Sequence, residues 1–253
     1  MSEPKLEEIR NVAFISHGGA GKTSLIEAIL YNAKLTDRLG SVDNSSSVMD
    51  FDPVEINKKM SINSKVCTIE YNKFLLNIVD TPGYGNFLHE TKIALSVVGG
   101  SVLIASAISG IKAETERVWE YSEEFDLSRL IFVNKMDKER ADFYRAIADI
   151  EKSFGVKVVP LMLPIGKEDS FKGVIDLVNE CALIYEKEGI AEYKKEDIPK
   201  EYRKSYEEFR TKLVETICEA EDSLLEKYLE GEDISKQELI SGIREGTISK
   251  KFV

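Results

Sequence analysis

The stretch Ser16-His17-Gly18-Gly19-Ala20-Gly21-Lys22-Thr23 follows an apolar run and leads directly into an amphipathic run. Its glycines allow backbone N–H groups to turn toward a single point, where the N-terminus of a following helix adds positive potential. In such a loop the lysine reaches phosphate oxygens and the threonine hydroxyl can hold Mg²⁺. Ser16 stands where the usual pattern has glycine, but it is small and ends the preceding run. The stretch, together with Ser24, predicts a phosphate-binding loop.

Around this loop, short apolar runs alternate with amphipathic stretches over the first two-thirds of the chain, as in βαβ units. The pattern predicts an α/β fold of the P-loop NTPase type, with a mainly parallel sheet and helices on both faces. The predicted strands are Asn11–Ser16, Lys65–Glu70, Phe74–Val79, Ser101–Ser106, Leu130–Val133 and Val156–Leu161. The predicted helices are Lys22–Tyr31, Phe87–Val98, Ala113–Phe125 and Phe143–Phe154.

A second motif, Asp80-Thr81-Pro82-Gly83, comes at the end of the predicted strand Phe74–Val79. A carboxylate at this point can accept a hydrogen bond from a Mg²⁺-bound water, and Gly83 can offer its N–H to a γ-phosphate. The motif is weak by itself. Its position after a strand, downstream of the phosphate-binding loop, makes it a strong indication of a nucleotide site.

A third motif, Asn134-Lys135-Met136-Asp137, follows the predicted strand Leu130–Val133. Asp137 can accept two hydrogen bonds from the guanine N1–H and exocyclic amine, a pair of donors that adenine lacks. The aliphatic part of Lys135 would cover the base, and Asn134 would tie this segment to the phosphate-binding loop. Together the three motifs predict binding of GTP and GDP with Mg²⁺.

The region between Thr36 and Asn63 shows no periodic pattern, and we expect a mobile loop there, where a nucleotide switch would place one. After Pro164 the chain becomes more acidic, with a predicted strand pair and three helices. These are Phe171–Asp176, Ala182–Tyr185, and the helices near Glu201–Ala220, Ser223–Glu230 and Lys236–Glu245. We therefore expect a GTP-binding domain at 1–164, an inserted acidic α+β subdomain at 165–246, and a return to the first domain at 247–253.

The composition narrows the classes of function. A net charge of −11 disfavours a surface that embraces a nucleic-acid backbone as a whole, so direct DNA binding is not expected. No apolar run is long enough to span a membrane, and residues 1–8 are too polar for a signal peptide, so we expect a cytoplasmic protein. The three cysteines, Cys67, Cys181 and Cys218, lie far apart and are expected to be reduced thiols.

With these motifs, the chain from about Arg10 to Val253 resembles the translational GTPases, and most closely elongation factor G and its second-type paralogues. The resemblance includes stretches that are specific to that branch: Asn77–Gly83, Phe132–Asp137, Ala141–Phe143, Leu163–Gly166 and Phe171–Gly173. It implies a GTPase that acts with the ribosome, through rRNA and stalk proteins, as part of a full-length factor. Its catalytic residues would be Lys22, Gly83 and Tyr84.

Three positions depart from the family pattern. Ser61 falls where the family has a switch threonine that ligates Mg²⁺ in the triphosphate state, so the metal ligands would be Thr23, Ser61 and Asp80. Tyr84 replaces the histidine that positions the attacking water, and a phenol with an ordinary pKa of about 10 is a poor base at neutral pH. Gly19 replaces an aspartate linked to binding of a monovalent cation. The expectation is slow hydrolysis.

The chain ends at Val253, before the Ser-Ala box by which the family contacts guanine O6, so we expect a fragment of a longer factor with weakened guanine affinity. Other functions stay open. One is a docking module that binds nucleotide with little or no hydrolysis. Another, within the same family, is a tetracycline-protection or peptide-release factor. An ATP-dependent P-loop kinase is disfavoured by the Asn134–Asp137 motif.

Overall fold

A computed structural model describes residues 5–186 and 192–253, and their contacts divide the chain into two compact units, Met1–Asn134 and Lys135–Val253. Residues 1–4 of the predicted first domain and 187–191 of the predicted insertion lie outside the described residues. The boundary that the contacts define comes earlier than residue 164, and the domain limits expected from the sequence stay a prediction.

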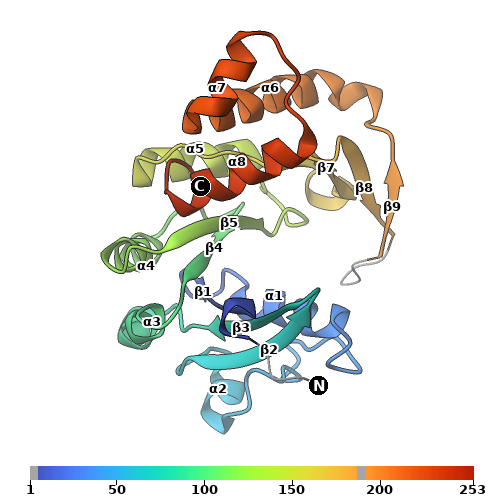
Figure 1. Cartoon of the computed structure of the whole chain (residues 1–253). Helices are drawn as coiled ribbons and strands as arrows, with labels where there is room; N and C mark the ends of the chain where they lie inside the picture. The colour runs from blue at the N-terminus through green and yellow to red at the C-terminus, as the bar shows by residue number, and fades with distance from the viewer. Residues whose placement is uncertain (1–4, 187–191) are drawn as a thin grey trace. The chain divides into compact units, whose positions relative to one another are not determined.

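The first unit contains a five-stranded sheet of order β2-β3-β1-β4-β5 (Figure 1). Its members are β1 (Ile9–Ile15), β2 (Lys65–Tyr71), β3 (Phe74–Asp80), β4 (Gly100–Ser106) and β5 (Ser128–Asn134). All neighbours are parallel except β2, which runs antiparallel to β3. The mainly parallel sheet is therefore confirmed. The parallel strands end at one edge, where the three sequence motifs begin.

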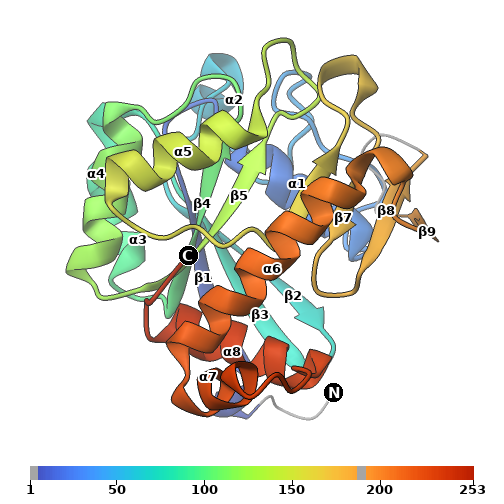
Figure 2. The same cartoon turned by 90° about the horizontal axis from the view of Figure 1, so that it is seen from above.

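Helices cover both faces of this sheet, as predicted. Helix α1 (Lys22–Asn32) lies on one face, and α3 (Leu88–Leu95) and α4 (Ala113–Glu124) lie on the other (Figure 2). Apolar side chains of α1 pack on the sheet with those of the strands; the buried cluster is Phe14, Ala20, Ile26, Leu30, Met49, Ile69, Ile78 and Ile104. This packing fixes the start of α1, and with it the loop that precedes it, against the end of β1.

The region 36–63 contains regular structure that the sequence did not lead us to expect. It contains a short helix, α2 (Pro53–Lys58), so the expectation of a loop is wrong for this part. The Asp52 side chain accepts a hydrogen bond from the N–H of Val54, and Pro53 occupies the first turn, where its missing N–H is not needed. An aspartate followed by proline is a helix-start signal, and it could have been recognised in the sequence.

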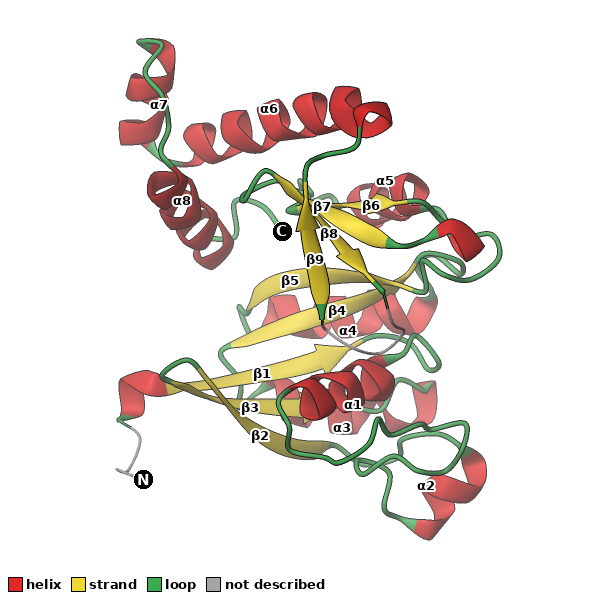
Figure 3. Cartoon of the chain, turned by 90° about the vertical axis from the view of Figure 1, so that its right-hand side faces the viewer, coloured by secondary structure: helices red, strands yellow, loops and turns green. Residues whose placement is uncertain are grey.

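The second unit contains a four-stranded antiparallel sheet of order β6-β7-β8-β9 and four helices among its described residues. The strands are β6 (Met162–Ile165), β7 (Gly173–Asp176), β8 (Cys181–Tyr185) and β9 (Tyr193–Glu196). The helices are α5 (Phe143–Phe154), α6 (Arg203–Ala220), α7 (Asp222–Leu229) and α8 (Lys236–Ile248), and α7 and α8 pack against α6 (Figure 3). Short 3₁₀ turns complete the two units: η1 (Leu6–Glu8), η2 (Gly85–Phe87), η3 (Glu168–Ser170) and η4 (Lys200–Tyr202).

The predicted strand Val156–Leu161 is wrong, because this segment, which is described throughout, is not part of either sheet. Its backbone is nevertheless extended enough to pair with one residue. The N–H of Val159 donates to the carbonyl of Val253 at 2.8 Å, and the N–H of Val253 donates to the carbonyl of Lys157 at 3.0 Å. Two hydrogen bonds to the single residue Val253 are too few to form a β-ladder. The apolar side chains instead belong to the core of the second unit, with Val159 beside Leu163, Ile217 and Leu239.

No helix in the described part of the chain is long and apolar enough to cross a membrane. The three cysteines are free thiols, in agreement with the expectation from their spacing.

Candidate functional site

The predicted phosphate-binding loop connects β1 to α1 and has the backbone conformation that the motif requires. Gly19 and Gly21 have positive φ values of 79° and 103°, which L side chains rarely adopt. A Cβ atom at Gly21 would lie 2.3 Å from the Asn134 side-chain nitrogen, so this position also has no space for a side chain. Gly21 directly precedes the first residue of α1, and the loop therefore surrounds a helix N-terminus.

Neighbouring elements hold the loop in place through side-chain hydrogen bonds. The Ser16 hydroxyl donates to the carbonyl of Ile104 in β4 at 2.6 Å. The His17 ring contacts the hydroxyl of Thr115 in α4 with its Nδ1 at 2.8 Å. The Asn134 amide donates to the carbonyl of Ala20 at 2.9 Å, which is the link to the loop that the third motif predicted. The His17 side chain is therefore buried and linked to α4.

Lys22 lies at the start of α1 with its ammonium group buried. The Nζ atom donates to two backbone carbonyls of the loop, those of Ser16 at 3.3 Å and His17 at 3.2 Å. Burial lowers the pKa of Lys22 to about 8, although the charge of Asp80 opposes this shift. A buried cation held by neutral carbonyls is costly unless an anion joins it. The lysine is thus suited to receive a phosphate group.

Three oxygen-bearing side chains meet beside this lysine. The Thr23 hydroxyl donates to Asp80 Oδ2 at 2.7 Å and lies 3.3 Å from the Ser61 hydroxyl. Asp80 Oδ1 is buried and accepts no hydrogen bond from the described residues. Burial raises the pKa of Asp80 to about 6, against the opposing effect of Lys22. Hard oxygen ligands with an unsatisfied buried carboxylate oxygen fit Mg²⁺, and the structure brings the three predicted metal ligands together.

Ser24 is exposed on the first turn of α1, next to Thr23. Its side chain does not belong to the buried oxygen cluster. Any contribution of Ser24 to nucleotide binding would come from its position at the helix N-terminus.

The loop after β3 approaches the phosphate-binding loop so closely that glycine is required. A Cβ atom at Gly83 would lie 2.5 Å from Lys22 Nζ and 2.6 Å from the backbone nitrogen of Gly18. The next residue, Tyr84, lays its ring over Gly18, since a Cβ atom there would be 2.6–2.7 Å from three ring carbons. The Tyr84 side chain is partly exposed, at 41%. Tyr84 therefore covers one side of the phosphate-binding loop.

The third motif spans the boundary between the two compact units, because Asn134 ends the first and Lys135 begins the second. Lys135 has a left-handed backbone with a φ of 65°. Asp137 is half-exposed at 49% and its carboxylate lies 2.7 Å from the ammonium of Lys138. The Asp137 side chain is thus accessible to a ligand.

The structure also contains buried charged residues near the oxygen cluster that sequence reasoning did not identify. They are Glu27, Asp50, Glu55 and Lys65, all less than a tenth exposed. The only signal for the two acids in the region 36–63 was the helix-start pattern described above. Lys65 opens a strand and gave no signal at all.

The parallel sheet, the glycine loop that precedes α1, and the buried lysine define a P-loop nucleotide-binding protein. Residues 7–248 match the family described as the elongation factor Tu GTP binding domain, and the chain belongs to this family of translational GTPases. It is also similar to a crystal structure of a protein from Thermus thermophilus, with a TM-score of 0.90 and 31% sequence identity. That match covers 97% of this chain and 36% of the other, so the chain spans well under half of that protein's length.

Proposed function

We propose that this chain is the GTP-binding and GTP-hydrolysing module of a ribosome-associated elongation factor related to elongation factor G. The observation that carries the proposal is the oxygen cluster of Thr23, Ser61 and Asp80 beside the buried ammonium of Lys22. This arrangement provides one cationic group for the phosphates and three oxygens for a metal ion. Membership of a GTPase family supplies the reaction class.

In this proposal the chain's own residues bind and orient the triphosphate. The N–H groups of the glycine loop and Lys22 bind the phosphates, and Gly83 offers its N–H on the γ-phosphate side. Thr23, Ser61 and Asp80 would hold Mg²⁺, which when bound neutralises charge on the β- and γ-phosphates. The partial burial of these groups reduces the local dielectric and strengthens their interactions with the phosphates.

Guanine selectivity is assigned to Asp137, and one substitution tests it. Asp137→Asn replaces one acceptor oxygen by an NH₂ donor, which repels the guanine amine but can pair with the C2 carbonyl of xanthine. We expect the wild type to prefer GDP over xanthosine diphosphate and the variant to reverse this preference, measured by calorimetry. ADP should bind neither protein well. A wild type that binds ADP as tightly as GDP would overturn the guanine assignment.

A second function has a specific observation in its favour. Tyr84 packs its ring on Gly18 where the family usually has a water-positioning histidine, and a tyrosine there is consistent with a docking module that hydrolyses GTP slowly or not at all. Single-turnover hydrolysis with and without ribosomes separates the two functions. We expect Tyr84→His to hydrolyse GTP faster than the wild type, and a faster wild type would contradict the role given to Tyr84.

The proposed ribosomal partners rest on membership of the family, because the nucleotide site itself carries no information about them. We propose that the full-length factor contacts rRNA and stalk proteins in the cytoplasm, with the acidic second unit as a docking surface for the stalk. A ribosome-protection or release-factor relative is the alternative within the family. Sedimentation with ribosomes in the presence of a non-hydrolysable GTP analogue tests the proposal, and absence of nucleotide-dependent co-sedimentation of the full-length factor would count against it.

A further inference from the structure

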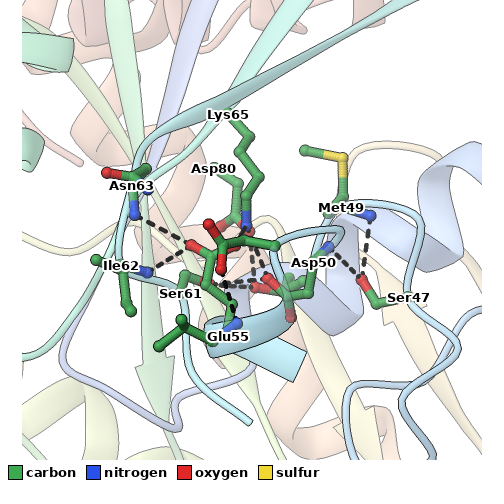
Figure 4. Close-up of polar contacts among 12 residues, drawn as sticks. Ser47, Met49, Asp50, Glu55, Ser61, Ile62, Asn63, Lys65 and Asp80 are labelled. Carbon is green, nitrogen blue, oxygen red and sulfur yellow. Dashed lines mark hydrogen bonds and ion pairs between the residues drawn. The ribbon is translucent and has the colours of Figure 1, made fainter. Parts of the chain in front are cut away.

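A buried network of charges lies in the region that precedes β2 (Figure 4). The ammonium of Lys65 is 3.0 Å from Asp50 Oδ1 and also forms an ion pair with Glu55 Oε2. The side chains of Lys65, Asp50 and Glu55 are exposed by only 7%, 4% and 0% respectively. Charges this deeply buried need one another, because each would otherwise lose its hydration without compensation. Lys65 is the first residue of β2, and Glu55 belongs to α2. The two ion pairs of Lys65 therefore hold Asp50 and α2 against β2.

The carboxylates of Asp50 and Glu55 also accept hydrogen bonds from the Ser61 hydroxyl and from the backbone that follows Ser61. Glu55 Oε1 accepts hydrogen bonds from the N–H groups of Ile62 at 2.7 Å and Asn63 at 3.1 Å. Asp50 Oδ1 accepts a hydrogen bond from the Ser61 hydroxyl at 3.4 Å. The Ser61 hydroxyl in turn lies 3.3 Å from that of Thr23 in the oxygen cluster. A continuous chain of contacts thus connects Lys65 to the proposed metal site.

A second anchor fixes the beginning of this segment to α1. The buried carboxylate of Glu27 accepts hydrogen bonds from the Ser47 hydroxyl at 2.6 Å and from the N–H of Met49 at 3.0 Å. The segment 47–63 is therefore held at one end by α1 and at the other by β2. These contacts involve only side chains and backbone of the chain itself, and they place Ser61 beside Thr23.

We propose that Lys65 is a positioning residue for the metal site: through Asp50 and Glu55 it pre-forms the Ser61 ligand and thereby favours GTP over GDP. The inference rests on the proposed function, because Ser61 is expected to ligate Mg²⁺ only in the triphosphate state. The physical reason is the cost of ordering. When a ligand binds only one conformation of a protein, its apparent affinity falls with the fraction of the protein in that conformation.

The double variant Lys65→Met/Glu55→Gln removes the central cation and one of its two partners. The loss of one positive and one negative charge leaves the summed charge of Lys65, Asp50 and Glu55 unchanged, but Asp50 loses its ion pair, and thermal unfolding reports that cost. The matched control is Lys58→Met, which makes the same substitution at an exposed position of α2. Circular dichroism and thermal unfolding establish that each variant is folded before binding is compared.

We expect the double variant to bind GTP about tenfold more weakly at saturating Mg²⁺, as when the competent conformation falls to about a tenth of the population, while GDP binding changes less than about twofold. In the nucleotide-free protein, the amides of Ile62 and Asn63 should exchange with deuterium faster than in the wild type and in Lys58→Met. The exchange measurement does not depend on nucleotide at all.

The outcomes separate the inference from the function on which it rests. The first case is a wild type that binds both nucleotides and a double variant with the same ratio of GTP to GDP affinity. That result would overturn the positioning role of Lys65 and leave the proposed function intact. Unchanged exchange at Ile62 and Asn63 would likewise overturn it. A wild type that binds neither nucleotide would instead remove the proposed function, and the GTP preference with it.

Discussion

The contact between Tyr84 and the phosphate-binding loop makes a prediction about Gly18. Gly18 does not have a positive φ, so its backbone conformation accepts an alanine. The added Cβ atom, however, would lie 2.6–2.7 Å from three carbons of the Tyr84 ring. Ordinary contact needs 3.4–4 Å, so the ring has to move by roughly 1 Å or leave the loop. The substitution Gly18→Ala therefore tests whether the ring is packed where the structure places it.

The expected magnitude combines two opposing effects. Overpacking costs about 1–3 kcal/mol of unfolding free energy, and the low end of about 1 kcal/mol applies here, because the clashing carbons lie at the far end of a ring that is 41% exposed and can swing away. Replacing glycine by alanine at a compatible position stabilises by about 0.4–1 kcal/mol, because it restricts the unfolded chain. Gly18→Ala should therefore be neutral to slightly destabilising, by about 0–0.6 kcal/mol, in the wild-type background. In a Tyr84→Ala background the clash is absent, and the same substitution should be neutral or slightly stabilising.

Urea unfolding of the nucleotide-free wild type, the two single variants and the double variant gives the coupling energy directly. We expect a coupling of about 0.5–1 kcal/mol between positions 18 and 84, because the ring can move away at little cost. The control is Gly85→Ala, since a Cβ atom at Gly85 meets no atom within 4 Å. A coupling energy below about 0.3 kcal/mol would be within the error of additivity and would refute the packing of the Tyr84 ring on the loop.

Three further predictions concern other parts of the molecule. Thr23→Ala should weaken Mg²⁺-dependent GDP binding about tenfold or more and make it nearly independent of Mg²⁺, whereas Thr23→Ser should retain both properties in calorimetry. Leu213→Ala, at a side chain that is 1% exposed, should lower the unfolding free energy by about 2–5 kcal/mol in urea titrations, and a loss below about 1 kcal/mol would contradict its place in the core. Hydrogen bonds from Lys227 and Ser235 lower the pKa of Glu238 from 4.5 to about 2, so its stabilising contribution is present above pH 4.5 and is lost as the pH falls toward 2. The difference in unfolding free energy between the wild type and Glu238→Gln should therefore disappear as the pH is lowered from 4.5 to about 2. A difference that does not change with pH would exclude a role for the Glu238 charge.

Much of the fold could be predicted from the sequence because it depends on local patterns. The apolar runs of β1 and β3 and the helical spacing of α1 appear in the structure within one or two residues of the predicted bounds. The phosphate-binding loop was equally clear, since its glycines are required by backbone geometry and close approach, which are properties of the positions themselves. Two predictions are wrong, for different reasons. Residues 36–63 contain the helix α2, whose start signal at Asp52 and Pro53 is local. Val156–Leu161, in contrast, has its backbone partner Val253 far away in the chain.

The sequence by itself determined the class of protein and the three motif positions and predicted the nucleotide, because each motif is a short run whose chemistry depends on residue type and spacing. Only the tertiary structure decided how those positions are held. Lys65 is an unremarkable lysine in the sequence, and it becomes the centre of a buried network because β2 and the region around α2 fold against each other. Tyr84 is likewise separated from Gly18 by more than sixty residues, and their contact exists because β1 and β3 are neighbours in the sheet. Contacts between distant segments depend on the whole packing arrangement, and no local pattern encodes them.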